Sequence, residues 1–235
     1  MKNILLLMMG GSGTRFGADI PKQYVEIDGV PVFAYILEKY SKMKEIDEVV
    51  AVSHRDWTGF VREWASKLEI YAKLHIVTGG DTRSASVLNG LVEASAFADD
   101  KDVVLIHDAT HPYVDVQGTI DVIKAARECG GATLAQYQYD TVYRKNANDM
   151  LEEVIPREVV AAGASPEAFL FGDIYRIYRD TPEEQFEIMT SAGAIALAND
   201  IKMKVIKANI INLKITYQED MEIFKKLAKT YFFED

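Results

Sequence analysis

The chain has 235 residues, 49% hydrophobic and 26% charged, which is typical of one globular α/β domain with a single core. Its formal net charge of -10 at pH 7 argues against a nucleic-acid partner, because such surfaces need clustered Lys and Arg. No apolar run reaches the roughly 18 residues that cross a membrane, so we expect a cytoplasmic protein without a membrane partner.

The first predicted element is a buried strand at Asn3–Met9, an apolar run that leads directly into glycines and lacks a signal-peptide cleavage site. Four further apolar runs are predicted as strands: Glu48–Val52, Lys73–Val77, Val103–Ile106 and Ala132–Tyr137. Amphipathic runs between them predict four helices: Val32–Lys44, Asp56–Leu68, Ser84–Phe97 and Asp115–Cys129. Cys129 is the single cysteine, which excludes an internal disulfide, and its thiol is expected to be buried.

Strict alternation of strand and helix predicts an α/β fold: a Rossmann-like, doubly wound and mostly parallel sheet. Sheets of this kind bind ligands beyond the carboxyl ends of their strands. The chemistry is therefore expected just after Met9, Val77 and Ile106, where glycines or polar residues follow.

Regularity breaks down between about residues 139 and 165, where polar and β-prone residues alternate without a helical period; this predicts a protruding β-arm. Beyond the arm the pattern resumes, with helices at Phe171–Arg179 and Glu183–Ala198, a strand at Lys204–Lys207 and a helix at Gln218–Tyr231. No linker or internal repeat interrupts the chain, so residues 1–235 are predicted to form a single domain.

The loop after the first strand reads Gly-Gly-Ser-Gly-Thr-Arg-Phe-Gly from Gly10 to Gly17. Glycines here allow a tight turn and bring backbone N–H groups against phosphate oxygens. The loop matches neither a Walker A motif nor the dinucleotide pattern, since Phe16 replaces the third glycine of the latter. Arg15 and Lys22 flank it, which suits attack on the α-phosphorus of a triphosphate. The alternative is a plain glycine turn with solvated cations.

Two later segments follow strands and carry polar groups. The first runs from Thr78 to Gly90, and its glycines with Ser86 favour hydrogen bonds to a base or phosphate, although N-capping explains the serine equally well. The second contains Asp108, placed to hold Mg²⁺ on a triphosphate or else to cap the next turn. His107 and His111 lack a third ligand and do not indicate a transition-metal site.

Taken in order, these segments resemble the methylerythritol-phosphate and ribitol-phosphate cytidylyltransferases. The resemblance covers nearly the whole chain and rests on five elements: Gly10–Arg15 with Pro21–Tyr24, Gly79–Arg83 with Ser86, His107-Asp108, Asp140-Thr141, and Asn212–Thr216. It implies a Rossmann-like domain, a β-arm that joins two subunits of a homodimer, and CTP with Mg²⁺ and a small polyol phosphate as ligands.

The resemblance also implies site residues. Arg15 and Lys22 would stabilise the transition state. The nucleotide would contact Met8, Met9, Gly10, Gly11, Gly80, Asp81, Arg83 and Ser86. The acceptor would contact Asp108, Thr141, Arg157 and Lys214, with Thr141 and Arg157 reached across the dimer and Asp108 also near the metal.

The stretch Ser53–Trp57 resembles an element of the ribitol-phosphate branch, which makes ribitol 5-phosphate the expected acceptor and 2-C-methyl-D-erythritol 4-phosphate the alternative. The chain departs from the family pattern at Met9, at His111, where arginine is usual, and at Ala164–Glu167. We expect His111 to be neutral at pH 7 and to regain the arginine's charge below about pH 6.5.

Three other interpretations stay open at this stage. A short-chain oxidoreductase would need a Tyr-x-x-x-Lys pair after the later strands, but both pairs in this chain precede the second strand. A glycosyltransferase or another nucleotidyltransferase shares the fold class, and the first loop with Lys22 favours a nucleoside triphosphate over a retained diphosphate. A non-catalytic relative of the enzymes is the third.

Overall fold

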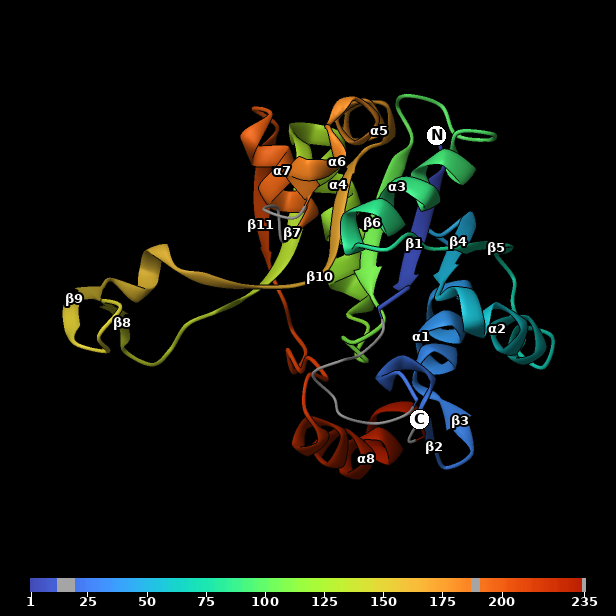
Figure 1. Ribbon diagram of the computed structural model, residues 1–235, viewed down its shortest axis with the longest axis horizontal. Coiled ribbons are helices and arrows are strands. Elements are labelled where there is room, and N and C mark those ends of the chain that lie inside the picture. The colour runs from blue at the N-terminus through green and yellow to red at the C-terminus, as the bar shows by residue number, and fades with distance from the viewer. Residues whose placement is uncertain (12–19, 187–190, 234–235) are drawn as a thin grey trace.

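The computed structural model describes residues 1–11, 20–186 and 191–233. Its centre is a seven-stranded sheet with helices on both faces (Figure 1). The spatial order of the strands is β11 (Lys202–Lys207), β7 (Gly130–Tyr137), β10 (Ala161–Leu170), β6 (Val103–Asp108), β1 (Asn3–Met9), β4 (Glu48–Ser53) and β5 (Lys73–Thr78). All neighbours are parallel except β10, which runs antiparallel to β6 and β7. The predicted Rossmann-like, mostly parallel sheet is confirmed.

Strand β1 shows why the sheet needs a helical layer on each face. Leu5 and Leu7 point into one core, and Ile4 and Leu6 point into the other, so the whole strand is buried. The first core is closed by α1 (Val32–Ser41), α2 (Thr58–Ala65), α4 (Val116–Cys129) and α8 (Gln218–Phe233). The second is closed by α3 (Arg83–Ala94), α5 (Phe171–Asp180) and α7 (Ala192–Ala198). A continuous apolar run is therefore what a strand covered on both faces requires.

Three details differ from the sequence prediction. Strand β10 was missed because Gly163 and Pro166 resemble turn signals; the strand accommodates them where its register to β7 shifts, between Gly163 and Glu167. The helix predicted over Glu183–Ala198 is two pieces, α6 (Glu183–Phe186) and α7, with residues 187–190 outside the described chain. The burial predicted for Cys129 is wrong, since the thiol is exposed at the end of α4.

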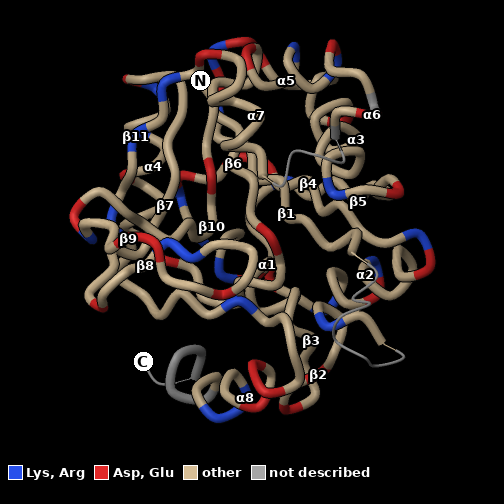
Figure 2. The backbone as a smooth tube through the Cα atoms, turned by 60° about the vertical axis from the view of Figure 1, so that its left-hand side comes forward, with Lys and Arg blue, Asp and Glu red and all other residues tan. Residues whose placement is uncertain are grey.

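A hairpin projects from one side of the sheet (Figure 1). It consists of β8 (Val142–Lys145) and β9 (Leu151–Ile155), and the chain returns through the 3-10 turn η4 (Arg157–Val159) into β10. Charged residues of both signs follow its backbone (Figure 2), including an ion pair of 3.2 Å between Arg144 and Glu153. Apolar side chains are exposed along it as well: Tyr139, Tyr143, Met150, Leu151, Val154 and Val159.

The remaining short elements lie near the ends of β1 and β4. They are η2 (Lys22–Tyr24), the hairpin of β2 (Glu26–Ile27) and β3 (Val30–Pro31), and η3 (Arg55–Trp57). Within the described ranges, no helix combines the length and the apolar character needed to cross a membrane.

Candidate functional site

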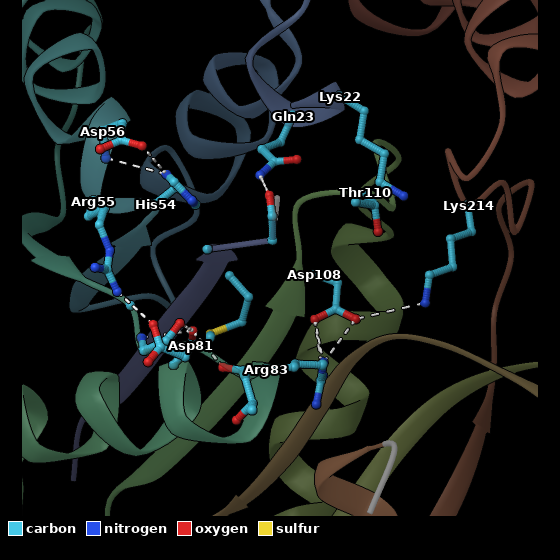
Figure 3. Close-up of a pocket in the computed structure, with 17 residues that line it drawn as sticks. Lys22, Gln23, His54, Arg55, Asp56, Asp81, Arg83, Asp108, Thr110 and Lys214 are labelled. Carbon is cyan, nitrogen blue, oxygen red and sulfur yellow. Dashed lines mark hydrogen bonds and ion pairs between the residues drawn. The ribbon is translucent and has the colours of Figure 1, made fainter. Parts of the chain in front are cut away.

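A pocket of about 640 Å³ opens at the carboxyl ends of β1, β4, β5 and β6, the edge where the sequence predicted the chemistry (Figure 3). Loops that follow these four strands supply most of the lining. The lining residues are Met8, Gly10, Gly11, Lys22, Gln23, His54, Arg55, Asp56, Gly79, Gly80, Asp81, Thr82, Arg83, Ser86, Asp108, Thr110 and Lys214.

One wall of the pocket is a close approach between the β1 loop, the β5 loop and the start of α3. A Cβ on Gly10 would lie 2.9 Å from Ser86 Oγ, and a Cβ on Gly79 only 2.7 Å from it, so a side chain at either position would displace the Ser86 hydroxyl. Ser86 Oγ accepts a hydrogen bond from Gly80 N at 3.1 Å. Thr82 caps α3 by accepting from Ala85 N at 3.0 Å, which removes the alternative that Ser86 is a simple cap.

The opposite wall carries a cluster of charges (Figure 3). Arg83 donates from Nε to Asp108 Oδ1 at 3.0 Å and Oδ2 at 3.3 Å, and Lys214 Nζ lies 4.0 Å from Oδ2. Burial alone would raise the pKa of Asp108, but Arg83 and then Lys214 outweigh burial and hold that pKa below its usual value. Asp108 therefore faces the pocket as a carboxylate, and the Arg83 side chain lies with it rather than beside Gly80.

The structure describes only one of the two residues predicted as catalytic. Lys22 lies on η2 and lines the pocket, whereas Arg15 lies outside the described residues. Met8 lines the pocket too, but the Met9 side chain is 1% exposed and packs in the opposite core, because successive side chains alternate along β1. The Met9 side chain therefore does not line the pocket, and the predicted nucleotide contact at Met9 stays a prediction.

The sequence prediction did not include the pocket residues that follow β4. His54, Arg55 and Asp56 line the pocket, and Arg55 donates to Asp81 Oδ1 at 2.6 Å across its mouth. The available signal was their place directly after a predicted strand, since β4 belongs to the same parallel edge as β1.

Thr141 and Arg157 do not reach the pocket within one chain. Arg157 lies at the base of the hairpin, where it donates to the Tyr139 carbonyl at 2.5 Å and lies 3.6 Å from Glu158. Thr141 is an exposed residue of the irregular segment that leads from β7 out to β8.

Comparison with known proteins decides the family. Residues 4–229 match the family model described as IspD, 2-C-methyl-D-erythritol 4-phosphate cytidylyltransferase. The chain belongs to this cytidylyltransferase family. A Thermotoga neapolitana enzyme named 2-C-methyl-D-erythritol 4-phosphate cytidylyltransferase is 33% identical over 97% of this chain and 98% of its own. A ribitol-5-phosphate cytidylyltransferase from Vibrio parahaemolyticus is 28% identical over 97% of this chain and 96% of its own.

Among solved structures, the chain resembles 4-diphosphocytidyl-2C-methyl-D-erythritol synthase from Anaerococcus prevotii, with a TM-score of 0.78 at 25% identity over 97% of this chain and 96% of that one. Members of the family are CTP-using cytidylyltransferases, so the chain is a nucleotidyltransferase. This excludes the oxidoreductase and glycosyltransferase interpretations. Because relatives of both names match 97% of this chain, family membership leaves the acceptor undecided.

Two histidines near the pocket, His107 and His111, have pKa values well below the ordinary value and are neutral at pH 7. Burial lowers the pKa of His111 to about 4, and the neighbouring His107 and Lys214 lower it further than Asp108 raises it. The expectation that His111 regains a charge below about pH 6.5 is therefore wrong. His107 is fully buried, accepts from the Tyr40 hydroxyl at 2.8 Å through Nδ1, and donates from Nε2 to the His111 carbonyl at 2.8 Å.

His107 should make the stability of the cytidylyltransferase depend on pH. Burial lowers its pKa to about 4 from the ordinary 6.5. At a pH between these two values, His107 binds a proton in the unfolded chain but not in the folded chain. The free energy of unfolding should fall by about 2 kcal/mol for this residue between pH 7 and 5. Urea unfolding of the wild type and of His107→Gln at both pH values measures it. Equal pH dependence in the two proteins would contradict the assignment.

Proposed function

We propose that this cytidylyltransferase transfers CMP from CTP to ribitol 5-phosphate and releases pyrophosphate. The observation that supports the acceptor choice is the resemblance of the Ser53–Trp57 segment to the ribitol-phosphate branch. Three residues of this segment, His54, Arg55 and Asp56, line the pocket, so the segment belongs to the site. Arg55 pairs with Asp81 on the side of Gly80, so the support comes from the resemblance and not from a contact with the acceptor wall.

The reaction needs little covalent help from the protein. A phosphate oxygen of the acceptor attacks the α-phosphorus of CTP, a new P–O bond forms, and the bond from that phosphorus to the pyrophosphate oxygen breaks. The attacking oxygen is already anionic at neutral pH, so no general base is required. Positioning and stabilisation of the growing negative charge supply the catalysis.

The pocket offers groups for both substrates. Near the glycines, Gly80 and Ser86 would bind the cytidine nucleotide, and Lys22, with Arg15 as its predicted partner, would stabilise charge on the α-phosphate and the leaving pyrophosphate. At the opposite wall Lys214 would bind the acceptor phosphate. Asp108, held as a carboxylate, would accept hydrogen bonds from the acceptor hydroxyls.

Mg²⁺ would enter with the triphosphate. The described residues contain no group of three His, Cys, Asp or Glu that could hold a metal ion by itself. Mg²⁺ is usually coordinated by one or two protein carboxylates and by oxygen atoms of substrate phosphates. Asp108 at the pocket wall would supply such a carboxylate. The bound ion would neutralise charge on the pyrophosphate leaving group.

The test is pyrophosphate release from CTP and Mg²⁺ with ribitol 5-phosphate, 2-C-methyl-D-erythritol 4-phosphate and other pentitol phosphates compared at equal concentration. The proposal expects the highest kcat/KM for ribitol 5-phosphate.

The second candidate acceptor is 2-C-methyl-D-erythritol 4-phosphate, which is favoured by the 33% identity to the Thermotoga enzyme. A higher kcat/KM with this acceptor would replace the first candidate. CTP binding without pyrophosphate from any acceptor would favour a non-catalytic relative.

We also propose that the hairpin joins two chains and brings Thr141 and Arg157 of the partner subunit to each pocket. The exposed apolar side chains along the hairpin support this, because a solvated hairpin has no need of them. Neither Thr141 nor Arg157 lines the pocket of its own chain.

Complementation should reveal this arrangement. Lys22→Ala and Arg157→Ala should each inactivate a homodimer, whereas co-expression of the two should restore about a quarter of the wild-type sites, since a mixed dimer keeps one intact pocket. Sedimentation measures the dimer, and pyrophosphate release measures the restored activity. Activity of the co-expressed pair no higher than that of the single variants would argue that Arg157 acts within its own chain.

A further inference from the structure

Two adjacent residues of η2, Gln23 and Tyr24, tie together three segments around the pocket. Gln23 Nε2 donates to the carbonyls of Met9 and Gly11, both at 2.7 Å. Tyr24 donates its hydroxyl to the Met9 carbonyl at 2.8 Å and accepts from His54 N at 3.0 Å. We propose that Gln23 and Tyr24 are positioning residues, a clamp that fixes the start of the glycine loop relative to Lys22. The proposal rests on the cytidylyl transfer proposed above.

The two hydrogen bonds of the clamp to the Met9 carbonyl are buried, which makes their loss costly, whereas those to Gly11 and from His54 are partly buried. Gln23 is 2% exposed and Tyr24 is 1% exposed, so the Met9 carbonyl released from them would face no replacement water without a shift of the backbone. Burial also raises the pKa of Tyr24 to about 12, and its hydroxyl therefore stays protonated and able to donate at neutral pH.

The aromatic side of the clamp fixes where the Tyr24 hydroxyl points. The Tyr24 ring stacks on Trp57 with centroids 4.7 Å apart and planes 6° apart, and it meets Phe33 and Phe60 edge to face. Trp57 belongs to the same segment as His54, whose N–H donates to the hydroxyl. The position of the His54 segment is thereby coupled to that of the β1 loop.

The clamp connects to the chemistry through Lys22, which directly precedes Gln23. Gln23 reaches from η2 toward the end of β1 while Lys22 extends into the pocket on the other side (Figure 3). In a trans peptide the C=O and the next N–H point in opposite directions, so the hold on the Met9 carbonyl also fixes the Gly10 N–H. A phosphate-binding backbone and a catalytic cation would then keep a fixed separation.

Two variants test the clamp against a matched control. Tyr24→Phe removes the hydroxyl, and Gln23→Glu places a carboxylate against two carbonyls. The control is Tyr35→Phe, because Tyr35 is 5% exposed and likewise donates to a backbone carbonyl, that of Ile27 at 2.7 Å, away from the pocket lining. The clamp predicts that kcat falls roughly tenfold in Tyr24→Phe and about 100-fold in Gln23→Glu, with the KM for CTP changed less than kcat. Tyr35→Phe should stay within about twofold of the wild type.

A Lys22→Ala background separates positioning from a general loss of structure. If the clamp acts through Lys22, Tyr24→Phe should cost about twofold or less in that background, because residues that act as a unit are not additive. The same fold loss in both backgrounds would overturn the proposal. So would wild-type kcat in both clamp variants, or an equal loss in Tyr35→Phe.

Amide hydrogen exchange supplies a readout that does not depend on turnover. The backbone at residues 9–11 should exchange faster in Tyr24→Phe and Gln23→Glu than in the wild type and Tyr35→Phe. Unchanged exchange there would overturn the clamp even if activity fell. Absence of activity in the wild type with every acceptor would count against the proposed function alone, since exchange still decides whether the clamp holds the loop.

Discussion

Replacement of Lys22 by alanine is expected to lower kcat by roughly 10²–10³-fold, the usual cost of removing one donor to the charge that develops in a transition state. Lys22 lies on η2 and lines the pocket. The KM for CTP should change much less, because the contacts proposed for the nucleotide at Gly80 and Ser86 do not involve Lys22. Steady-state pyrophosphate release with CTP varied measures both constants.

Lys44→Ala is a suitable control for this variant, since it removes an exposed lysine near the end of α1 and changes the net charge equally. It should leave kcat and KM within about twofold. If Lys22→Ala weakened CTP binding by the same factor as kcat, Lys22 would only bind the nucleotide. The assignment of Lys22 to the transition state would then fail.

Replacement of Asp108 by asparagine should reduce kcat/KM for the acceptor by roughly 10–100-fold. This corresponds to a loss of about 1.5–3 kcal/mol, the usual contribution of hydrogen bonds to a charged group. Asparagine keeps the shape but removes the charge that Arg83 and Lys214 face. The two cations would then repel each other and shift, so the acceptor phosphate would lose its orientation. The KM for CTP should change less than the acceptor KM, because Asp108 would act on the nucleotide only through Mg²⁺.

Asp81→Asn gives the reciprocal comparison within the same pocket. Asp81 lies at the mouth, on the side of Gly80, and pairs with Arg55. This variant should raise the KM for CTP and leave the acceptor KM nearly unchanged. If both variants raised the same constant by the same factor, the division of the pocket into a nucleotide wall and an acceptor wall would be wrong.

The fold could be predicted from the sequence where the burial of an element determines a clear pattern of apolar residues. Strand β1 is buried on both faces and therefore reads as an unbroken apolar run, and its predicted bounds match those observed. Strand β10 could not be found this way. Gly163 and Pro166 lower its intrinsic preference for a strand, and the strand forms because β6 and β7 pair with it on both sides.

Part of the site was predictable, because its residues directly follow predicted strands of the parallel sheet. Glycines after β1 and β5 and the carboxylate after β6 were identified from their order along the chain, and the structure places Gly10, Gly80 and Asp108 around one pocket. The ion pair between Arg83 and Asp108 was not predictable. The two residues are 25 positions apart in the sequence, and the direction of the Arg83 side chain depends on how the elements pack. Gln23 was recognised as part of a motif, but its bonds to two carbonyls became apparent only in three dimensions.

The antiparallel strand at the middle of the sheet has a mechanical consequence. The hairpin leaves through β7 and returns through β10, and these strands pair with each other from Ala161 and Tyr137 inward. Strand β10 then pairs with β6, with Glu167 opposite Ile106, two positions before Asp108. The hairpin itself is a separate two-stranded sheet, joined to the main sheet through residues 138–141 and 156–160. A partner bound to the hairpin would therefore reach the strand that carries Asp108 through these two segments and then through the hydrogen bonds of β10 with β6.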